Sequence, residues 1–283
     1  MNHLTRFITS KTQLARTIKE CSYNNVQPII NYTVKRINNK ADVHEHMNVY
    51  KHLIRKFSFN FHTLSVSSVG LNYDTLSDII EEIQKNNCIC IVDAEKYLIH
   101  DTVNSYVDRI RICQPFIPNI YKTYQMYRKD AMEHLIDDIK MYKTLDIPLN
   151  INLIRGRYMD DKEFNVIYDT KEEVDDNYNK AVKMLLKMCL LNSNLNVIFT
   201  THNKESIEIF KNSKSPNVHH AFMMDFEQHS HINDKDYSIN RMVYLPFKPY
   251  NKKIEERVYQ YSSAIDDNKL KPLDCNKVTC AFA

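Results

Sequence analysis

A regular alternation of two kinds of segment most constrains how this chain of 283 residues can fold. Short apolar runs rich in β-branched and aromatic residues alternate with segments whose apolar residues recur at helical spacing. This alternation predicts parallel strands joined by crossover helices. Eight such units are the number in a TIM-like (βα)8 barrel, so we predict an α/β fold with eight parallel strands. The predicted strands span residues 28–34, 63–69, 88–93, 116–124, 149–155, 197–201, 218–223 and 241–247.

The segments between the predicted strands include three with a clear apolar stripe, at residues 43–57, 132–142 and 178–189. Leu14 and Ile18 form a shorter stripe, which predicts one short helix ahead of the barrel. We expect a single barrel domain over residues 1–265, because no linker, repeat or low-complexity segment interrupts it. Residues 266–283 open with Asp-Asp-Asn-Lys and are expected to form a loose C-terminal tail.

Charge and hydropathy argue against two classes of partner. The formal net charge is +3, and the basic residues are interspersed with acidic ones, so we expect no binding to nucleic acid. No apolar run approaches the ~20 residues of a membrane-spanning helix, so we expect no transmembrane segment.

The seven cysteines bear on the cellular compartment. Their number is odd and none forms a CxxC motif, which indicates free thiols in a reducing environment. Cys88 and Cys90 fall on one face of a predicted strand and are expected to be buried packing. Residues 1–19 are basic and lack acids, as in a mitochondrial transit peptide. We favour an amphipathic first helix there, and so predict a cytoplasmic protein with a mitochondrial one as the alternative.

Motifs for metals and phosphates are missing from the sequence. The histidines at 44–52 lack the HExxH spacing, and those at 219–231 have no cysteine or acid at zinc-finger spacing. We therefore interpret them as surface and core residues and predict no metal site. Gly70 and Gly156 are the only glycines, which excludes a glycine-rich phosphate loop. A glycine at position 156, where a predicted strand ends, is expected to have a backbone reason.

Polar side chains end consecutive predicted strands, which is where functional residues lie in a barrel. Asp93 directly follows an apolar run, and a carboxylate there is costly unless it is paired. One such residue alone is best explained as a hydrogen-bond partner of a loop backbone. Five strand ends in succession favour a site instead. These residues are Asp93, Glu95, Thr123, Tyr124, Gln125, Arg155, Gly156, Thr201, His202, Asn203 and Tyr244.

Residues 150–158 read Asn-Ile-Asn-Leu-Ile-Arg-Gly-Arg-Tyr, with Thr-Lys at 170–171 and a tyrosine at 178. This stretch resembles the flavin-dependent proline dehydrogenase family, whose pattern is Leu-Val-Arg-Gly-Ala-Tyr followed by Thr-Lys…Thr-Asp…Tyr. Four further segments, 92–95, 122–131, 201–203 and 244–249, resemble the family's strand ends in order and spacing. The resemblance covers roughly residues 60–250 and is more specific than any one motif.

The resemblance implies an FAD cofactor held across the barrel mouth. By this resemblance Gln125 would contact the flavin ring, and all four implied cofactor-binding residues are present. The other three would contact the ribityl and phosphate region of FAD, and they are Lys171, His202 and Asn203.

The resemblance also implies a substrate side, where the family takes a hydride from proline. Asp93, Tyr158 and Tyr244 would line it as the catalytic residues, and all three are present.

The cationic residues of the family's site are replaced in this sequence, including one that faces the flavin. Ser65 stands five residues before a glycine, where the family has lysine, and Asn152 replaces a basic residue three before the Arg-Gly pair. Tyr259 and Gln260 replace an arginine pair, and Glu256 replaces a tyrosine. Two arginines grip the carboxylate of proline in the family. Their loss, at about 3–5 kcal/mol for each buried charge pair broken, predicts a large loss of proline binding.

Two long cationic side chains replace small residues near the expected flavin. Arg157 stands where the family has alanine, and Lys248 where it has glycine. Either side chain can fill the vacated anion site or extend to solvent. We predict that Arg157 pairs with Asp93 or Glu256 across the mouth, because a buried carboxylate without a partner is costly.

Two functional hypotheses follow from the resemblance. The first is a catalytically silent relative, a pseudoenzyme retained for a binding or structural role with a protein partner. The alternative is an active FAD-dependent dehydrogenase. It would convert proline to 1-pyrroline-5-carboxylate and reduce a quinone-type acceptor, or it would oxidise a related amine. The clustering of the lost cations favours the first hypothesis.

Overall fold

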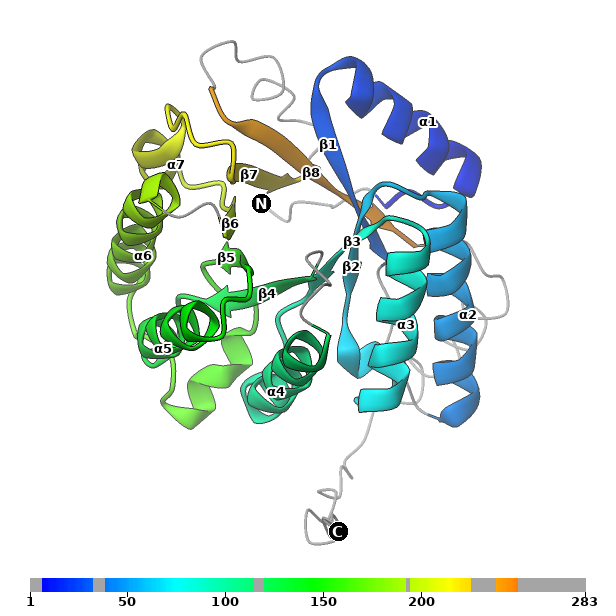
Figure 1. Cartoon of the computed structure of the whole chain (residues 1–283), viewed down its shortest axis with the longest axis horizontal. Helices are drawn as coiled ribbons and strands as arrows, with labels where there is room; N and C mark the ends of the chain where they lie inside the picture. Colours follow the sequence, from blue (N-terminus) through cyan, green and yellow to red (C-terminus); the bar gives the residue numbers. More distant parts are fainter. Residues whose placement is uncertain (1–6, 33–38, 115–119, 192–193, 225–237, 249–283) are drawn as a thin grey trace, which may run out of the picture. The chain divides into compact units, whose positions relative to one another are not determined.

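A computed structural model describes residues 7–32, 39–114, 120–191, 194–224 and 238–248 (Figure 1). The described strands form one closed barrel in the order β1 to β8, and β8 pairs with β1. All eight neighbouring pairs are parallel, which confirms the predicted barrel. The strands are β1 (Val26–Tyr32), β2 (Phe61–Leu64), β3 (Ile89–Val92), β4 (Ile120–Gln125), β5 (Leu149–Ile154), β6 (Leu195–Thr200), β7 (Val218–Met223) and β8 (Asn240–Phe247).

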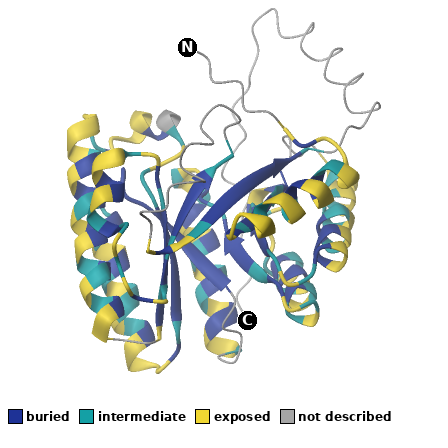
Figure 2. Ribbon diagram, turned by 90° about the horizontal axis from the view of Figure 1, so that it is seen from above, coloured by how far each residue is buried: buried dark blue, intermediate teal, exposed yellow. Residues whose placement is uncertain are grey.

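Helices surround the barrel, with exposed residues on their outer faces and buried strands inside (Figure 2). The predicted short helix ahead of the barrel is present as α1 (Lys11–Tyr23), and its N-cap Ser10 accepts a hydrogen bond from Gln13 N. Among the described residues, no helix is both long and apolar enough to cross a membrane. The other helices are α2 (Lys40–Lys56), α3 (Tyr73–Lys85), α4 (Tyr97–Cys113), α5 (Ala131–Thr144), α6 (Lys171–Leu191) and α7 (Lys204–Phe210), with the 3₁₀ turns η1 (Val66–Val69) and η2 (Met159–Phe164).

The predicted strand at residues 63–69 differs from the structure, and the predicted end of the domain lies outside the described residues. The strand expected at 63–69 was wrong beyond Leu64, because Val66–Val69 form η1 and Gly70 ends it in the left-handed region at φ 88°. Val66 and Val69 are buried, so their apolar character imitated a strand. The domain boundary at 265 and the tail at 266–283 lie outside the described residues and stay predictions.

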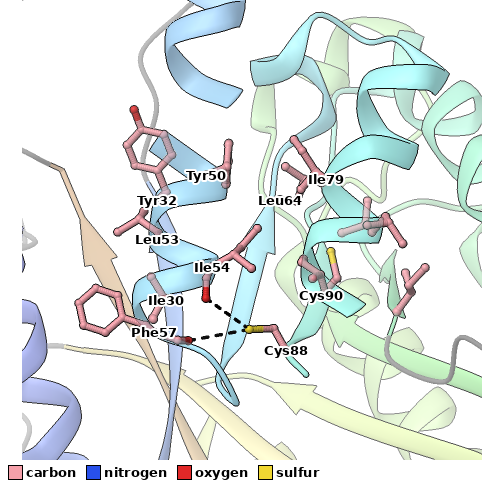
Figure 3. Close-up of a cluster of buried hydrophobic side chains, with 14 of the residues drawn as sticks. Ile30, Tyr32, Tyr50, Leu53, Ile54, Phe57, Leu64, Ile79, Cys88 and Cys90 are labelled. Atoms are coloured by element: carbon pink, nitrogen blue, oxygen red, sulfur yellow. Dashed lines mark hydrogen bonds between the residues drawn. The ribbon is translucent and has the colours of Figure 1, made fainter. Parts of the chain in front are cut away.

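The outer face of β1–β3 packs against α2 and α3. The side chains of Cys88 and Cys90 are fully buried in this layer, which confirms their predicted role as packing (Figure 3). The Cys88 thiol lies 3.8 Å from the carbonyl oxygen of Ile54 and 3.9 Å from that of Phe57. Burial raises the pKa of the Cys90 thiol well above its ordinary value, so this sulfur is held as an unreactive thiol.

The interior of the barrel is filled in layers of side chains. One buried layer is apolar and includes Ile29, Phe61 and Ile91. Side chains two residues apart on a strand face the same side, so the next layer toward the carboxyl ends begins at Asn31. This second layer is mostly polar, and it contains Asn31, Thr63, Asp93, Thr123, Asn152, Thr200 and Met223. The barrel interior therefore changes from apolar to polar toward the carboxyl ends of the strands, and a site for a polar ligand can form there.

Candidate functional site

A cavity of about 770 Å³ lies at the carboxyl ends of the strands. Five of the seven predicted site residues line it, from β3, β6, β8 and α6 and their adjoining loops. Gln125 and Tyr158 are not in the described lining. The five lining residues are Asp93, Lys171, His202, Asn203 and Tyr244.

The floor of the cavity is a chain of neutral hydrogen bonds that runs across four strands, from β6 to β3. Thr200 Oγ1 donates to Asn152 Oδ1 at 2.8 Å, and Asn152 Nδ2 donates to Thr123 Oγ1 at 3.0 Å. Thr123 Oγ1 then donates to the carbonyl oxygen of Val92 at 2.6 Å. Tyr244 is buried beside Thr200 and Asn152, and burial raises the pKa of its phenol well above the ordinary value. Asn152 stands where the family has a basic residue, and its side-chain amide is hydrogen-bonded to two neutral partners, Thr123 and Thr200.

An ion pair spans the mouth beside this floor. Arg157 Nη1 lies 3.4 Å from Asp93 Oδ2, which confirms the predicted pairing. The Asp93 side chain is 14% exposed and that of Arg157 is 51% exposed. Burial raises the pKa of Asp93 from 3.8 to about 6, although the neighbouring guanidinium lowers it. The other predicted partner, Glu256, lies outside the described residues.

Two further residues near the mouth are turned toward the protein itself. Tyr158 Oη donates to the carbonyl oxygen of Ala94 at 3.0 Å, which ties the loop after β5 to the end of β3. Lys248 Nζ lies 5.4 Å from the centroid of the Phe7 ring. Of the two long cations that replace small family residues, only Arg157 lines the described cavity.

Three donor side chains contact the carboxylate of Asp175, which lies on α6 at the edge of the cavity. Arg155 and Lys171 both pair with its carboxylate, and Asn203 Nδ2 donates to it at 3.0 Å. Arg155 also donates to Ser206 Oγ at 2.6 Å, so it is anchored on both sides. The sequence prediction missed Asp175 as a site residue. The aspartate in the family pattern Thr-Lys…Thr-Asp…Tyr falls on this position and was the available signal.

A second carboxylate, Glu95, is buried behind the mouth and is 2% exposed. It accepts hydrogen bonds from Ser65 Oγ at 2.9 Å, from Ser67 N at 3.0 Å and from Ser67 Oγ at 2.9 Å. Gln125 Nε2 donates to the backbone oxygen of Glu95 at 2.9 Å. The Gln125 Oε1 atom is buried and accepts no hydrogen bond from the described residues. Ser65, at the position of a family lysine, thus serves as a neutral donor to an acid.

Gly156 is required by the ring of Tyr127. A Cβ atom at position 156 would lie 2.2 Å from Tyr127 Cγ, far inside contact distance. The Tyr127 hydroxyl donates to Asp161 Oδ2 at 2.7 Å, and Asp161 also accepts from the backbone N–H of Tyr97. The expected reason for this glycine therefore lies in the close approach of a tyrosine of the same chain.

Within the part of the chain that the structure describes, no three or more histidine, cysteine or acidic side chains are grouped to hold a metal. His202 Nε2 accepts a hydrogen bond from Met223 N at 3.2 Å. His46 contacts the Tyr32 hydroxyl at 3.0 Å, and His52 contacts Lys11 Nζ at 2.8 Å.

A closed (βα)8 barrel with a cavity at the carboxyl ends of its strands has the layout in which barrel proteins place their functional sites. A sequence model for proline dehydrogenase matches residues 14–238, and the chain belongs to that family. Proline dehydrogenase 2, mitochondrial, from Arabidopsis thaliana is 26% identical over 153 residues, which cover 47% of this chain and 30% of that protein. Hydroxyproline dehydrogenase from Xenopus laevis is 28% identical over 143 residues, which cover 47% and 30%.

Solved structures show the same fold. Proline utilization A from Bdellovibrio bacteriovorus, inactivated by N-propargylglycine, superposes with a TM-score of 0.72 at 14% identity. That match covers 91% of this chain and 32% of the other. Proline utilization A with proline bound in remote sites gives a TM-score of 0.67 at 16% identity, and covers 83% and 28%. The chain spans about a third of the length of the relatives it matches.

Proposed function

We propose that this member of the proline dehydrogenase family does not oxidise proline and is retained for a binding or structural role. The observation that carries the proposal is the bonding of the two described residues at lost cationic positions. Ser65 is hydrogen-bonded to Glu95, and Asn152 is hydrogen-bonded to Thr123 and Thr200. Neutral residues tied into the protein in this way offer no charge to a substrate carboxylate.

The electrostatics of the mouth support the same proposal. The proline carboxylate would approach Asp93, whose only described cationic partner is Arg157. That guanidinium is already engaged, so a second carboxylate would share it with Asp93. The family's arginine pair is replaced by Tyr259 and Gln260, which lie outside the described residues and add no positive charge.

The cofactor side of the cavity fits FAD better than the substrate side fits proline. Lys171, His202 and Asn203 line one cavity of about 770 Å³ with Arg155 beside them, although Lys171, Arg155 and Asn203 all contact the Asp175 carboxylate. Gln125, which the resemblance assigns to the flavin ring, is buried and lies outside the described lining of this cavity. In the family, bound FAD supplies a hydride acceptor. We infer that these residues would hold FAD if the chain retains it.

The retained set of residues also favours a second candidate. Asp93, Tyr244 and the implied cofactor residues are all present, as in an active FAD-dependent dehydrogenase. Such an enzyme would convert proline or a related amine and pass electrons to a quinone-type acceptor. A protein partner is proposed for the first candidate, the non-catalytic binding or structural role. The compartment, with relatives named mitochondrial, stays a prediction.

Dye-coupled oxidation of proline with added FAD tests the first candidate. The Arabidopsis relative, assayed in parallel, serves as the positive control. We expect no turnover by this chain. A rate on the ordinary enzyme scale of ~1 s⁻¹ or above would overturn the proposal and establish the second candidate.

Titration with FAD, followed by flavin fluorescence and melting temperature, tests the cofactor side separately. A ligand at 100 times its Kd stabilises the fold by about 2.7 kcal/mol. If FAD binds where we infer, Lys171→Ala should weaken it. Lys140→Ala, on the exposed face of α5, is the matched control because Lys140 pairs only with neighbouring Asp137 among the described contacts. An equal response of both variants would remove Lys171 from the cofactor site.

A further inference from the structure

The charges at the inner end of the mouth cavity are unbalanced toward the acid. Asp93 lines the inner end and is paired with Arg157, while Glu95 lies buried behind it and is hydrogen-bonded to Ser65 and Ser67. The remaining inner lining is neutral and comprises Asn31, Thr123, Asn152, Thr200 and Tyr244. Two carboxylates therefore lie near one guanidinium, and only Asp93 pairs with it among the described residues. The outer cations Arg155 and Lys171 are paired with Asp175 and do not correct this imbalance.

Arg157 is loosely held. Its contact with Asp93 is 3.4 Å long, its guanidinium carbon lies 5.7 Å from the centroid of the Tyr158 ring, and half of its side chain is exposed. Lys122 offers a contrast within the same barrel, because it is 3% exposed and bonds Asp108 at 2.8 Å and Asp138 at 2.6 Å. A long, solvent-reaching side chain held by one long ion pair and one distant ring contact can leave Asp93 at small cost.

We infer that the inner end of the cavity binds a small organic ammonium ion without a carboxylate, held by Asp93, and that Arg157 swings out to admit it. The inference rests on the proposed function, since it gives the mouth cavity a ligand of defined charge. A protonated amine donates hydrogen bonds to the Asp93 carboxylate and restores charge balance beside Glu95. The side chains of Met223 and Ile154 offer apolar contact to its carbon skeleton.

The charge of the ligand separates this inference from its rival. A zwitterion such as proline can bridge Asp93 and Arg157, with its ammonium on the first and its carboxylate on the second. In that case Arg157 is a carboxylate clamp and its removal weakens binding. In the arrangement inferred here Arg157 competes with the ligand, so its removal strengthens binding. The two arrangements therefore predict opposite changes in ligand affinity when Arg157 is removed.

Three five-membered rings of similar size supply the probes. Pyrrolidinium carries a positive charge, proline is a zwitterion, and tetrahydrofuran-2-carboxylate is an anion. Each is titrated calorimetrically into the full chain without an electron acceptor. We expect pyrrolidinium to bind most tightly and the anion not to bind. Asp93→Asn should weaken pyrrolidinium binding at least tenfold, which is about 1.4 kcal/mol. Arg157→Gln should strengthen it, and Arg55→Gln, in an exposed pair with Glu82 on α2 and α3, should leave it unchanged.

Several results would overturn the inference. They are binding of proline in preference to pyrrolidinium with loss of affinity in Arg157→Gln, unchanged pyrrolidinium affinity in Asp93→Asn, or no binding by any of the three rings. If Asp93→Asn does not fold, the inference is still tested by the order of affinities for the three rings and by whether Arg157→Gln strengthens or weakens pyrrolidinium binding. Proline turnover in the dye assay would overturn the proposed function instead, so the two failures are distinguishable.

Discussion

Arg157 and Asp93 face each other across the barrel mouth, with Nη1 and Oδ2 3.4 Å apart. The two residues follow β5 and β3, which are separated in the barrel only by β4. The family pattern that this chain resembles has alanine at position 157, so the pair places an added cation beside Asp93, the acid predicted for the substrate side. The contact is long and half exposed on the arginine side, which sets how much it can contribute to stability.

A double-mutant cycle on this pair should give a coupling free energy of about 1 kcal/mol. Arg157→Ala leaves Asp93 without its cation, and adding Asp93→Asn should recover part of the loss. Chemical denaturation of the four proteins measures the coupling. The exposed Lys140 and Asp137 pair on α5, with a 2.9 Å contact, provides a comparison cycle expected to give about half that value or less. A coupling below about 0.3 kcal/mol at Arg157 and Asp93 would show that the two side chains do not meet in solution.

The raised pKa of Asp93 predicts a pH-dependent effect of Asp93→Asn. Burial raises the pKa from 3.8 to about 6, so the folded protein holds this proton more tightly than the unfolded chain. The stability that the group contributes is therefore fully present below about pH 4 and is lost as pH rises through about 6. The loss is on the order of 3 kcal/mol. Asparagine does not ionise, so the variant should gain stability relative to the parent between pH 4 and 7. Urea denaturation across that range measures the difference, and a flat difference would contradict the shift.

The serine donors to Glu95 should matter for stability. Ser65→Ala removes a 2.9 Å hydrogen bond from a carboxylate that is 2% exposed. We expect a loss of about 2 kcal/mol, because hydrogen bonds to charged groups contribute about 1.5–3 kcal/mol. Ser58→Ala, at a serine outside this cluster near the opposite end of β2, serves as a comparison. Equal denaturation midpoints for Ser65→Ala and the parent would mean that Ser67 alone satisfies Glu95.

The barrel could be predicted because each strand and each helix is encoded by a residue pattern within its own segment. Each strand carries its own apolar run and each helix its own stripe, and the count of eight then selects a closed barrel. The error at 63–69 arose where the local pattern was ambiguous. Val66 and Val69 are as buried as strand residues, yet Ser65 and Ser67 turn toward Glu95, which is distant in sequence.

The site was predictable only in part, because its contacts join distant segments. Strand ends and family motifs identified Asp93, Lys171 and Asn203 as residues of one mouth, and they line one cavity. The meeting of Lys171 and Asn203 on Asp175 depends on how α6 lies against the loop after β6. The sequence predicted the pair of Arg157 and Asp93 from charge balance, but it did not predict that Gln125 and Tyr158 lie outside the lining or that Asp175 joins Lys171 and Asn203.

Gly156→Ala should be among the most damaging single substitutions in this chain. The added Cβ would lie 2.2 Å from Tyr127 Cγ, and the Tyr127 ring is 3% exposed and anchored by its hydroxyl to Asp161. The ring cannot move aside cheaply, so we expect a loss of about 3 kcal/mol in chemical denaturation. Gly70→Ala is the matched control, since its Cβ would lie 3.4 Å from Val43 and its cost of about 1 kcal/mol arises from φ +88°. In a Tyr127→Ala background the cost of Gly156→Ala should fall below about 1 kcal/mol, because the obstructing ring is gone. An undiminished cost in that background would mean that backbone conformation, and not the tyrosine ring, requires glycine at this position.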